Sequence, residues 1–372
     1  MFALQQQQGD TVRVLISGYY GFGNLGDEAL LEVIVRQLRE RFPALDLEVL
    51  SATPQATSAA YNVASVSRWQ WRSVREAIGR ADVVVSGGGG LLQSATSIRS
   101  LIYYVAILRD AIRAKRKTMI FAQSVGPLDG LGRFIVSRYC RGLKRATVRD
   151  ERSRELLQSL LPQTPVERTS DPVFLYDAPD ADVDLSGEGL GPESGPYAVV
   201  SVRKATGLQD GGRVVARAVD RLATVHGIRT AFLPLGGIPD AEVSTAIIRQ
   251  CSSAPVLLPE STLPIAAAVL RDARVVVGMR LHALILAARY AVPFLAIPYD
   301  PKVASLCSDL GYPLDALWTP GRPKPDDETV DALVDRLVGE RNALLAHLSE
   351  RVEAVRRLAE RNFDVLDELM KE

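Results

Sequence analysis

The sequence predicts an α/β protein built from two Rossmann-like, doubly wound domains that face a cleft. Three observations favour this fold class. Short runs of Val and Ile alternate with amphipathic stretches, which is typical of parallel strands covered by helices on both faces. Between Asp177 and Pro196 the composition changes to that of a linker, rich in Asp, Gly, Pro, Ser and Glu. The length of 372 residues also exceeds what one hydrophobic core usually supports.

The predicted elements follow this alternation along the chain. In the first half we expect strands at 12–17, 47–50, 82–86, 118–123 and 146–149, with helices that include 27–41 and 98–115. After the linker we expect strands at 197–202, 229–233, 256–258, 274–277 and 294–297, and helices from Asp327 onward. The predicted organisation is a first domain over 1–180, a linker over 181–196, a second domain over 197–345, and a C-terminal helix over 346–372 with the option of packing back on the first domain.

The composition excludes several classes of function. Lys and Arg (44) balance Asp and Glu (44), so no overall field favours nucleic acid or an anionic membrane, and we expect at most peripheral membrane association. Cys140, Cys251 and Cys307 lack metal-ligand or CxxC spacing and are interpreted as packing residues. The glutamine-rich N-terminus is unlike a signal peptide, and no apolar run reaches the ~18 residues of a membrane span. We therefore expect a cytoplasmic protein.

The segment from Val275 to Leu284 is the most informative part of the sequence. A buried strand ends there in glycine, and Arg280 and His282 follow where the next helix must begin. Carboxyl ends of parallel strands are where open α/β sheets bind ligands, and a helix N-terminus favours an anion. Arg280 adds a planar cation suited to phosphate or carboxylate, and His282 can transfer a proton near neutral pH. Together they predict a site for an anionic substrate that is protonated or deprotonated.

A glycine-rich turn, Gly21–Gly26, follows the first strand and matches the pattern G-x-G-x-x-G. A nicotinamide cofactor is disfavoured, because the second strand ends without an acidic residue for the ribose and because Asp27 and Glu28 would face the pyrophosphate. Two interpretations stay open. Either the turn is structural, with Asp27 capping a helix, or Asn24 and Asp27 hydrogen-bond the hydroxyls of a polar substrate.

A second glycine-rich loop, Ser86–Gln93, contains four consecutive glycines at another strand end. Such a run is costly in backbone entropy, so something should require a close approach to the backbone. We expect this to be a ligand or, as the alternative, the facing domain. Gly89 and Gln93 are therefore candidate substrate-binding residues.

Further basic residues follow other strand ends. Arg149 and Arg203 each have an ordinary alternative, a helix-start salt bridge and a surface position respectively, but both stand at strand carboxyl ends. Lys302 follows the next strand and comes to the same edge. His226 at a helix end and His347 on a helix surface are interpreted as structural.

Six segments resemble motifs of the polysaccharide pyruvyl transferases, most closely the CsaB-type enzymes of bacterial cell-surface polymers. In order, the segments are Gly23–Ala29, Ser86–Gln93, Gln123–Pro127, Arg149–Ser153, Met279–Ala283 and Tyr299–Lys302. The resemblance covers about Val12 to Tyr312, and the Arg-Leu-His segment at residue 280 is its most specific part.

This resemblance implies a glycosyltransferase-B-like fold. It also implies transfer of the pyruvyl unit of phosphoenolpyruvate onto two hydroxyls of one sugar, giving a cyclic ketal and phosphate. Arg280, Leu281 and His282 would then bind phosphoenolpyruvate in the second domain, and Arg203 or Arg149 would provide a further donor-binding arginine. The first domain, with its glycine loops, would take the acceptor. We expect no metal and no cofactor beside the donor substrate.

The CsaB likeness suggests the acceptor: N-acetylmannosamine on a lipid-linked precursor of a secondary cell wall polymer of the S-layer type, with galactose or glucose left open. The chemistry agrees, because cations suit the phosphate and carboxylate of the donor and His282 can protonate its enol carbon as a general acid. Two rivals remain. One is a nucleotide-sugar-dependent glycosyltransferase with Arg280 and Lys302 on the phosphates. The other is a non-catalytic sugar-phosphate-binding regulator.

Overall fold

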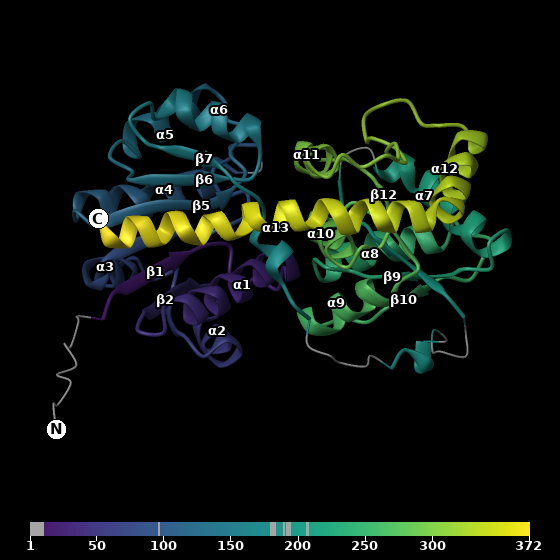
Figure 1. Cartoon of the computed structure of the whole chain (residues 1–372), viewed down its shortest axis with the longest axis horizontal. Coiled ribbons are helices and arrows are strands. Elements are labelled where there is room, and N and C mark those ends of the chain that lie inside the picture. The colour runs from purple at the N-terminus through teal and green to yellow at the C-terminus, as the bar shows by residue number, and fades with distance from the viewer. Residues whose placement is uncertain (1–10, 96, 179–183, 189, 191–194, 206–207) are drawn as a thin grey trace. The chain divides into compact units, whose positions relative to one another are not determined.

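The computed structural model describes residues 11–95, 97–178, 184–188, 190, 195–205 and 208–372, which form two compact units (Figure 1). Among the described residues, unit 1 comprises those within 11–22, 30–171 and 361–372, and unit 2 comprises those within 23–29 and 172–360. Residues 181–183, 189 and 191–194 of the predicted linker lie outside the described residues, as do residues 1–10. The linker therefore stays a prediction.

Unit 1 contains a parallel sheet in the order β3-β2-β1-β4-β5-β6-β7. The strands are β1 (Arg13–Ser17), β2 (Asp46–Ser51), β3 (Ala64–Ser67), β4 (Val83–Ser86), β5 (Lys117–Gln123), β6 (Arg145–Val148) and β7 (Val166–Arg168). The helices are α1 (Leu25–Arg41), which begins in the unit 2 segment, α2 (Pro54–Tyr61), α3 (Trp71–Arg80), α4 (Ile98–Arg113), α5 (Gly130–Tyr139) and α6 (Glu151–Leu160). The strand order reverses between β1 and β4, so right-handed crossovers place helices on both faces.

The edge strands of unit 1 were not predicted from the sequence. β4 is buried along its whole length, and its run of Val residues is the pattern that predicted it. β3 and β7 instead contain no fully buried residue. An edge strand faces solvent along one side, so it needs no continuous apolar run.

Unit 2 contains a second parallel sheet in the order β10-β9-β8-β11-β12. The strands are β8 (Tyr197–Ser201), β9 (Arg229–Phe232), β10 (Val256–Leu257), β11 (Val275–Gly278) and β12 (Phe294–Ala296), and all five were predicted. The helices are α7 (Leu208–Thr224), α8 (Ile238–Ile248), α9 (Leu263–Asp272), α10 (Leu281–Arg289), α11 (Pro301–Asp309), α12 (Asp327–Gly339) and α13 (Arg341–Lys371), with 3-10 turns η1 (Pro172–Leu175) and η2 (Ser186–Glu188). The order reverses between β8 and β11.

The end of α13 completes unit 1. Asn362 is fully buried, where its Oδ1 accepts a hydrogen bond from the Thr169 hydroxyl at 2.7 Å and its Nδ2 donates to the Ser170 carbonyl at 2.9 Å. The ring of Phe363 packs edge-on against Phe121, with 5.1 Å between the ring centroids. Residues 361–372 are therefore part of the unit 1 core and not a surface appendage.

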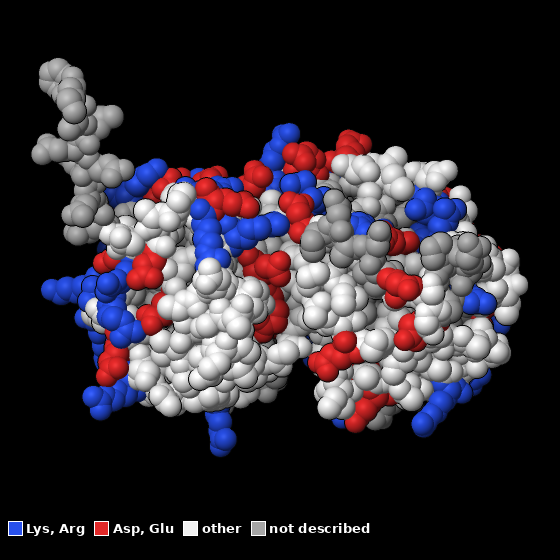
Figure 2. Space-filling model, turned by 90° about the horizontal axis from the view of Figure 1, so that it is seen from below, with Lys and Arg blue, Asp and Glu red and all other residues white. Residues whose placement is uncertain are grey.

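The predicted α/β class with parallel, doubly wound sheets is confirmed. On the face shown in Figure 2, basic and acidic side chains are interspersed, and large areas carry neither. This agrees with a net charge of zero. None of the described helices combines the length and the apolar composition needed to cross a bilayer.

Candidate active site

The candidate site lies where the strand order of unit 2 reverses. β8 and β11 are neighbours there, with Gly278 paired to Ser201. The main-chain N–H groups of Met279 and Arg280 both donate to the Ser201 carbonyl, at 2.8 and 3.4 Å, and tie the two strand ends together. Arg203 follows β8 by two residues and Arg280 follows β11 by two residues. Both arginines therefore follow strands that flank the reversal, the usual ligand-binding position of an open α/β sheet.

Arg280 precedes α10 and is held by a buried carboxylate. Its Nε and Nη2 donate to Oδ2 and Oδ1 of Asp240 at 2.7 and 2.6 Å, and Asp240 is only 1% exposed. A β-carbon on Gly236 would lie closer than 3.0 Å to Arg280 Nη2, so this glycine allows the pair to form. A guanidinium that gives Nε and Nη2 to one carboxylate still has its Nη1 edge to present to a second oxyanion.

Asp240 was not predicted from the sequence. It lies in the first turn of α8, after a glycine pair in which Gly237 has a φ of +67°. The signal that could have found it is the strand-to-helix turn Gly-Gly-Ile-Pro-Asp, which resembles the other strand ends that carry candidate residues. Its pairing with Arg280 spans 40 residues of sequence and depends on the fold.

His282 is the second residue of α10 and lies against the first glycine loop. Residues 23–29 belong to unit 2, and the Leu25 N–H donates to the Leu235 carbonyl at 3.1 Å. A β-carbon on Gly26 would overlap the imidazole of His282, nearest at Nδ1. Leu281 begins the same helix and is half-buried. The glycine at position 26 is thus explained by the approach of the histidine and needs no pyrophosphate.

Of the two interpretations left open for this turn, the structural one named the wrong capping residue. The helix α1 begins at Leu25, and Asp27 lies within its first turn. Asn24 is the capping residue, because its Oδ1 accepts a hydrogen bond from the Gly26 N–H at 3.1 Å. The side chain of Asn24 therefore has a structural role in the loop beside His282.

Arg203 contacts the segment that follows β12. Its Nη1 donates to the Tyr299 hydroxyl at 2.9 Å, and its guanidinium carbon lies 4.9 Å from the centre of that ring. Its Nε is buried and has no hydrogen-bond partner among the described residues. Lys302 is half-buried in the first turn of α11, where its N–H donates to Asp300 Oδ1 at 3.0 Å. Unit 2 therefore carries three predicted basic residues after three of its strands.

Arg149 lies in unit 1 and is buried in an ion pair. It is 7% exposed, and its Nη1 donates to the carboxylate of Asp171, which is 4% exposed. Its main-chain N–H donates to the Gln123 carbonyl at 3.0 Å. Arg149 thus forms a salt bridge, as the alternative interpretation from the sequence held. Its partner, however, is Asp171 and not the neighbouring Asp150 or Glu151.

The second glycine loop is approached by side chains of its own unit. A β-carbon on Gly87 would overlap the Tyr20 hydroxyl, and one on Gly88 would lie 2.8 Å from Leu30. Gly89 has a φ of +98°, which favours glycine, and Gln93 is half-buried in the loop. The expectation that a ligand or the facing domain explains this glycine run is therefore wrong for Gly87 and Gly88, although Gly89 and Gln93 stay candidates.

A model of the family described as polysaccharide pyruvyl transferase matches residues 24–301. The chain belongs to this family. The match begins at Asn24 and includes Arg203, Asp240, Arg280 and His282. A comparison with curated protein sequences gave no match. The finer CsaB-type resemblance stays a prediction.

Solved structures with a similar fold include proteins that bind UDP. S. aureus MnaA in a UDP co-structure has a TM-score of 0.67, at 10% identity over 97% of this chain and 98% of that chain. A glycosyltransferase from Rickettsia africae has a TM-score of 0.64, at 9% identity over 98% and 100%. UDP-GlcNAc 2-epimerase from Neisseria meningitidis, bound to UDP-GlcNAc, has a TM-score of 0.62, at 10% identity over 97% and 100%. The predicted glycosyltransferase-B-like fold is confirmed for this family member.

Other titratable residues of this pyruvyl transferase family member have structural partners. His226 Nε2 lies 2.8 Å from Asp335 Oδ1, and His347 Nε2 lies 2.9 Å from the Leu310 carbonyl. Burial raises the pKa of the Cys140 thiol to about 12, as expected of a packing residue. Within the described ranges, no group of three His, Cys, Asp or Glu residues is arranged to hold a metal ion.

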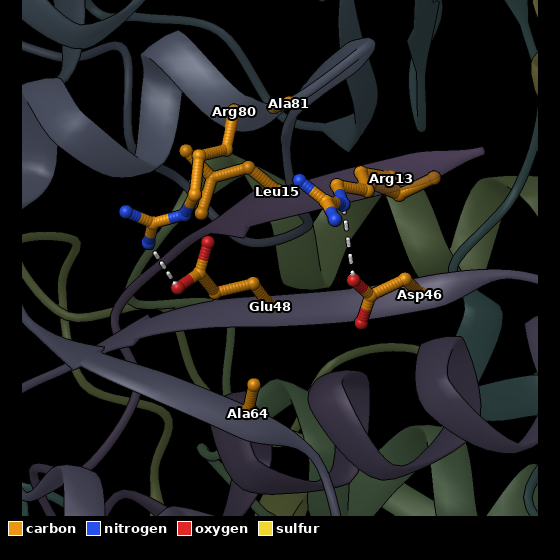
Figure 3. Close-up of a pocket in the computed structure, with 8 residues that line it drawn as sticks. Arg13, Leu15, Asp46, Glu48, Ala64, Arg80 and Ala81 are labelled. Atoms are coloured by element: carbon orange, nitrogen blue, oxygen red, sulfur yellow. Dashed lines mark hydrogen bonds and ion pairs between the residues drawn. The ribbon is translucent and has the colours of Figure 1, made fainter. Parts of the chain in front are cut away.

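Unit 1 contains a pocket that none of these residues lines (Figure 3). Arg13 and Asp46 are the first residues of β1 and β2, so the pocket is at the amino ends of the strands, opposite to the usual ligand-binding edge. Its charged side chains form ion pairs, Arg80 with Glu48 at 2.7 Å and Arg13 with Asp46 at 3.4 Å. The pocket therefore does not add to the candidate site.

Proposed function

We propose that this chain transfers the pyruvyl group of phosphoenolpyruvate onto two hydroxyls of a sugar in a cell-surface polysaccharide or its lipid-linked precursor, releasing phosphate. Family membership supports a transferase that acts in polysaccharide synthesis. The observation that carries the donor assignment is the position of Arg203 and Arg280 after the two strands that flank the reversal, with His282 in the first turn of α10.

The donor carries a phosphate and a carboxylate, and both need cationic partners. Arg280 is oriented by Asp240, so little freedom of its guanidinium is lost on binding. The N-terminus of α10 adds main-chain N–H groups and a favourable dipole. Arg203 is our choice for the second donor-binding arginine over Arg149, because Arg203 belongs to the same unit as Arg280 and Arg149 is buried with Asp171.

In this proposal His282 is the general acid. It protonates C3 of the enolpyruvyl group, which makes C2 an oxocarbenium centre. One sugar hydroxyl oxygen bonds to C2 and its proton returns to His282. The C2–O bond to phosphate then breaks, the second hydroxyl oxygen bonds to C2, and the proton of that hydroxyl leaves with the phosphate. The products are the cyclic ketal and hydrogen phosphate, and atoms and charge balance without a metal or another cofactor.

The contacts with the acceptor sugar are proposed in less detail than those with the donor. Asn24 and Asp27 in unit 2, and Gly89 and Gln93 in unit 1, are the polar or backbone groups predicted to contact the acceptor, and Lys302 is a further candidate for its anionic groups or those of the donor. N-acetylmannosamine in a secondary cell wall polymer precursor stays the expected acceptor of a CsaB-type enzyme. A cytoplasmic location stays an expectation.

A release assay separates this proposal from its rivals. The protein is incubated with phosphoenolpyruvate and with glycosides of N-acetylmannosamine, glucose and galactose, and inorganic phosphate is measured together with the mass of the sugar product. A pyruvyl transferase releases phosphate and forms a ketal. The structures bound to UDP make a nucleotide-sugar glycosyltransferase the second candidate, and release of UDP from a UDP-sugar in its place would support that candidate. Release of neither product would leave a sugar-phosphate-binding regulator.

A further inference from the structure

Three aromatic residues lie at the carboxyl edge of the unit 1 sheet. Tyr19 and Phe22 follow β1, and Trp69 follows β3 by two residues. Trp69 is 66% exposed and Tyr19 is 39% exposed, while Phe22 is half-buried. Exposed apolar side chains are ordinary when they are scattered singly. A cluster of them at the ligand-binding edge of a parallel sheet indicates a binding surface.

The three rings form one ordered cluster. Tyr19 and Phe22 are stacked, with 4.1 Å between the centroids and an interplanar angle of 9°. Trp69 meets Phe22 edge-on, at 5.9 Å and 85°. Both geometries are favourable for aromatic pairs. We name this group the aromatic platform.

A buried arginine packs against two rings of the platform. Arg68 is 7% exposed, and its guanidinium carbon lies 4.8 Å from the ring centre of Phe22 and 5.4 Å from that of Trp69. It also lies 4.5 Å from the ring centre of Tyr103. Its Nη1 donates to the Gly18 carbonyl at 2.9 Å, which ties β3 to the loop after β1. Because the cation is fixed by hydrogen bonds and ring faces, the platform is preorganised.

The loop that carries Tyr19 and Phe22 is also fixed. A β-carbon on Gly21, whose φ is +79°, would overlap Ser51, and the Thr53 hydroxyl donates to the Gly21 carbonyl at 3.3 Å. The same loop continues directly into residues 23–29, where Gly26 lies against His282. Along the chain, Phe22 is therefore only four residues from the glycine that borders the proposed general acid.

We propose that the aromatic platform is a carbohydrate subsite that stacks one neutral sugar ring of the acceptor glycan. A pyranose has a face of C–H groups that packs on the negative face of an aromatic ring, while its hydroxyls point outward to polar groups. A neutral ring suits this surface, because the supporting charge of Arg68 is buried and shared among several rings. The identity of the ligand as an acceptor rests on the proposed function. The stacking site itself does not.

Direct binding tests the platform without any reaction. Methyl β-glycosides of N-acetylmannosamine, glucose and galactose are titrated without phosphoenolpyruvate, by calorimetry or by saturation-transfer NMR. Trp69→Ala should lower the affinity for at least one glycoside by about tenfold, and Trp69→Phe should retain most of it. Phe134→Ala is the matched control, since Phe134 is an aromatic residue of α5 that is 58% exposed and lies outside the platform. It should bind like the wild type.

Steady-state kinetics add a second readout. Trp69→Ala should raise the KM for the acceptor and leave the KM for phosphoenolpyruvate unchanged. Unchanged glycoside binding together with an unchanged acceptor KM would overturn the platform while phosphate release still supported the transferase. If the wild type releases no phosphate but glycoside binding still depends on Trp69, the subsite stands and the proposed function falls. A loss seen only with a lipid-linked acceptor would assign the surface to the lipid and overturn the sugar subsite.

Discussion

Gly26 lies so close to His282 that a β-carbon on the glycine would overlap the imidazole ring. Gly21 and Gly23 are required by the backbone conformation of the turn, since their φ values of +79° and +73° lie in the left-handed region. Gly26 is instead required by a contact with a side chain that stands more than 250 residues later in the sequence. The turn therefore positions the candidate catalytic residue.

Gly26→Ala should lower turnover by about 100-fold, because a methyl group must displace the imidazole and a shift of ~1 Å at a reacting group can have that effect. The rate of phosphate release measures it. Gly79→Ala in α3 is the control, since a β-carbon there meets nothing within 4 Å. The control should keep its activity and gain ~0.5–1 kcal/mol in unfolding free energy. Normal turnover of Gly26→Ala would show that His282 tolerates displacement and is not the acid.

His282→Ala should lower turnover by about 10²–10⁴-fold, the range for loss of a general acid, with a smaller effect on donor binding. His282→Gln distinguishes proton transfer from hydrogen bonding, because glutamine donates a hydrogen bond but cannot release a proton to carbon. The wild-type pH–rate profile should fall at high pH, where the imidazolium loses its proton, and the glutamine variant should lack that limb. Near-wild-type turnover of His282→Gln with the limb retained would assign the acid to another residue.

Arg280→Ala should weaken phosphoenolpyruvate binding by ~1.5–3 kcal/mol, the range for hydrogen bonds to charged groups. Arg280→Lys should rescue only part of this, because an ammonium group lacks the planar fork. The alanine variant should also lose ~3–5 kcal/mol of stability, because it leaves the buried Asp240 carboxylate without its cation. Calorimetric titration and denaturant unfolding measure the two effects.

The double variant Arg280→Ala with Asp240→Asn separates stability from binding. Removing both charges should restore much of the unfolding free energy, since no carboxylate is left buried alone. It should not restore donor affinity. If the double variant binds phosphoenolpyruvate as well as the wild type, Arg280 serves the fold and not the donor.

Asp335 provides a prediction on acid stability. The hydrogen bond from Arg221, with a further one from His226, lowers the pKa of Asp335 to about 2. A carboxyl with a folded pKa below its unfolded value, ~3.9, stabilises the fold above that value and loses this effect as the pH falls towards about 2. Asp335→Asn should therefore lower the Tm modestly at pH 7, and the difference from the wild type should shrink between about pH 4 and pH 2. Thermal unfolding across this range measures it, and a constant difference would contradict the ion pair.

The sequence predicted the parts of the fold that are set by local patterns. β4, β8 and β11 are buried along their lengths, so their apolar runs identify them. Arg280 and His282 could be placed at a strand end for the same reason. The edge strands β3 and β7 carry no such pattern, because they are partly exposed.

Contacts between residues far apart in the sequence could not be predicted. Asp240 is an ordinary helix-start acid until the fold brings it to Arg280. The ion pair of Arg149 with Asp171 and the approach of Tyr20 to Gly87 likewise join segments whose spacing carries no signal. A glycine shows only that something must come close, and the sequence does not say whether this is a ligand or a neighbouring side chain.

The end of α13 has a consequence for biosynthesis. Asn362 and Phe363 complete the core of unit 1, but a ribosome makes them only after all of residues 172–360. At typical rates of translation, roughly ten seconds or more pass between the synthesis of the last strand of unit 1 and the synthesis of these residues. All residues of unit 2 have been synthesised before Asn362 and Phe363 are added. The nascent chain should therefore finish its second unit first, while the earlier-made sheet still lacks the residues that complete its core.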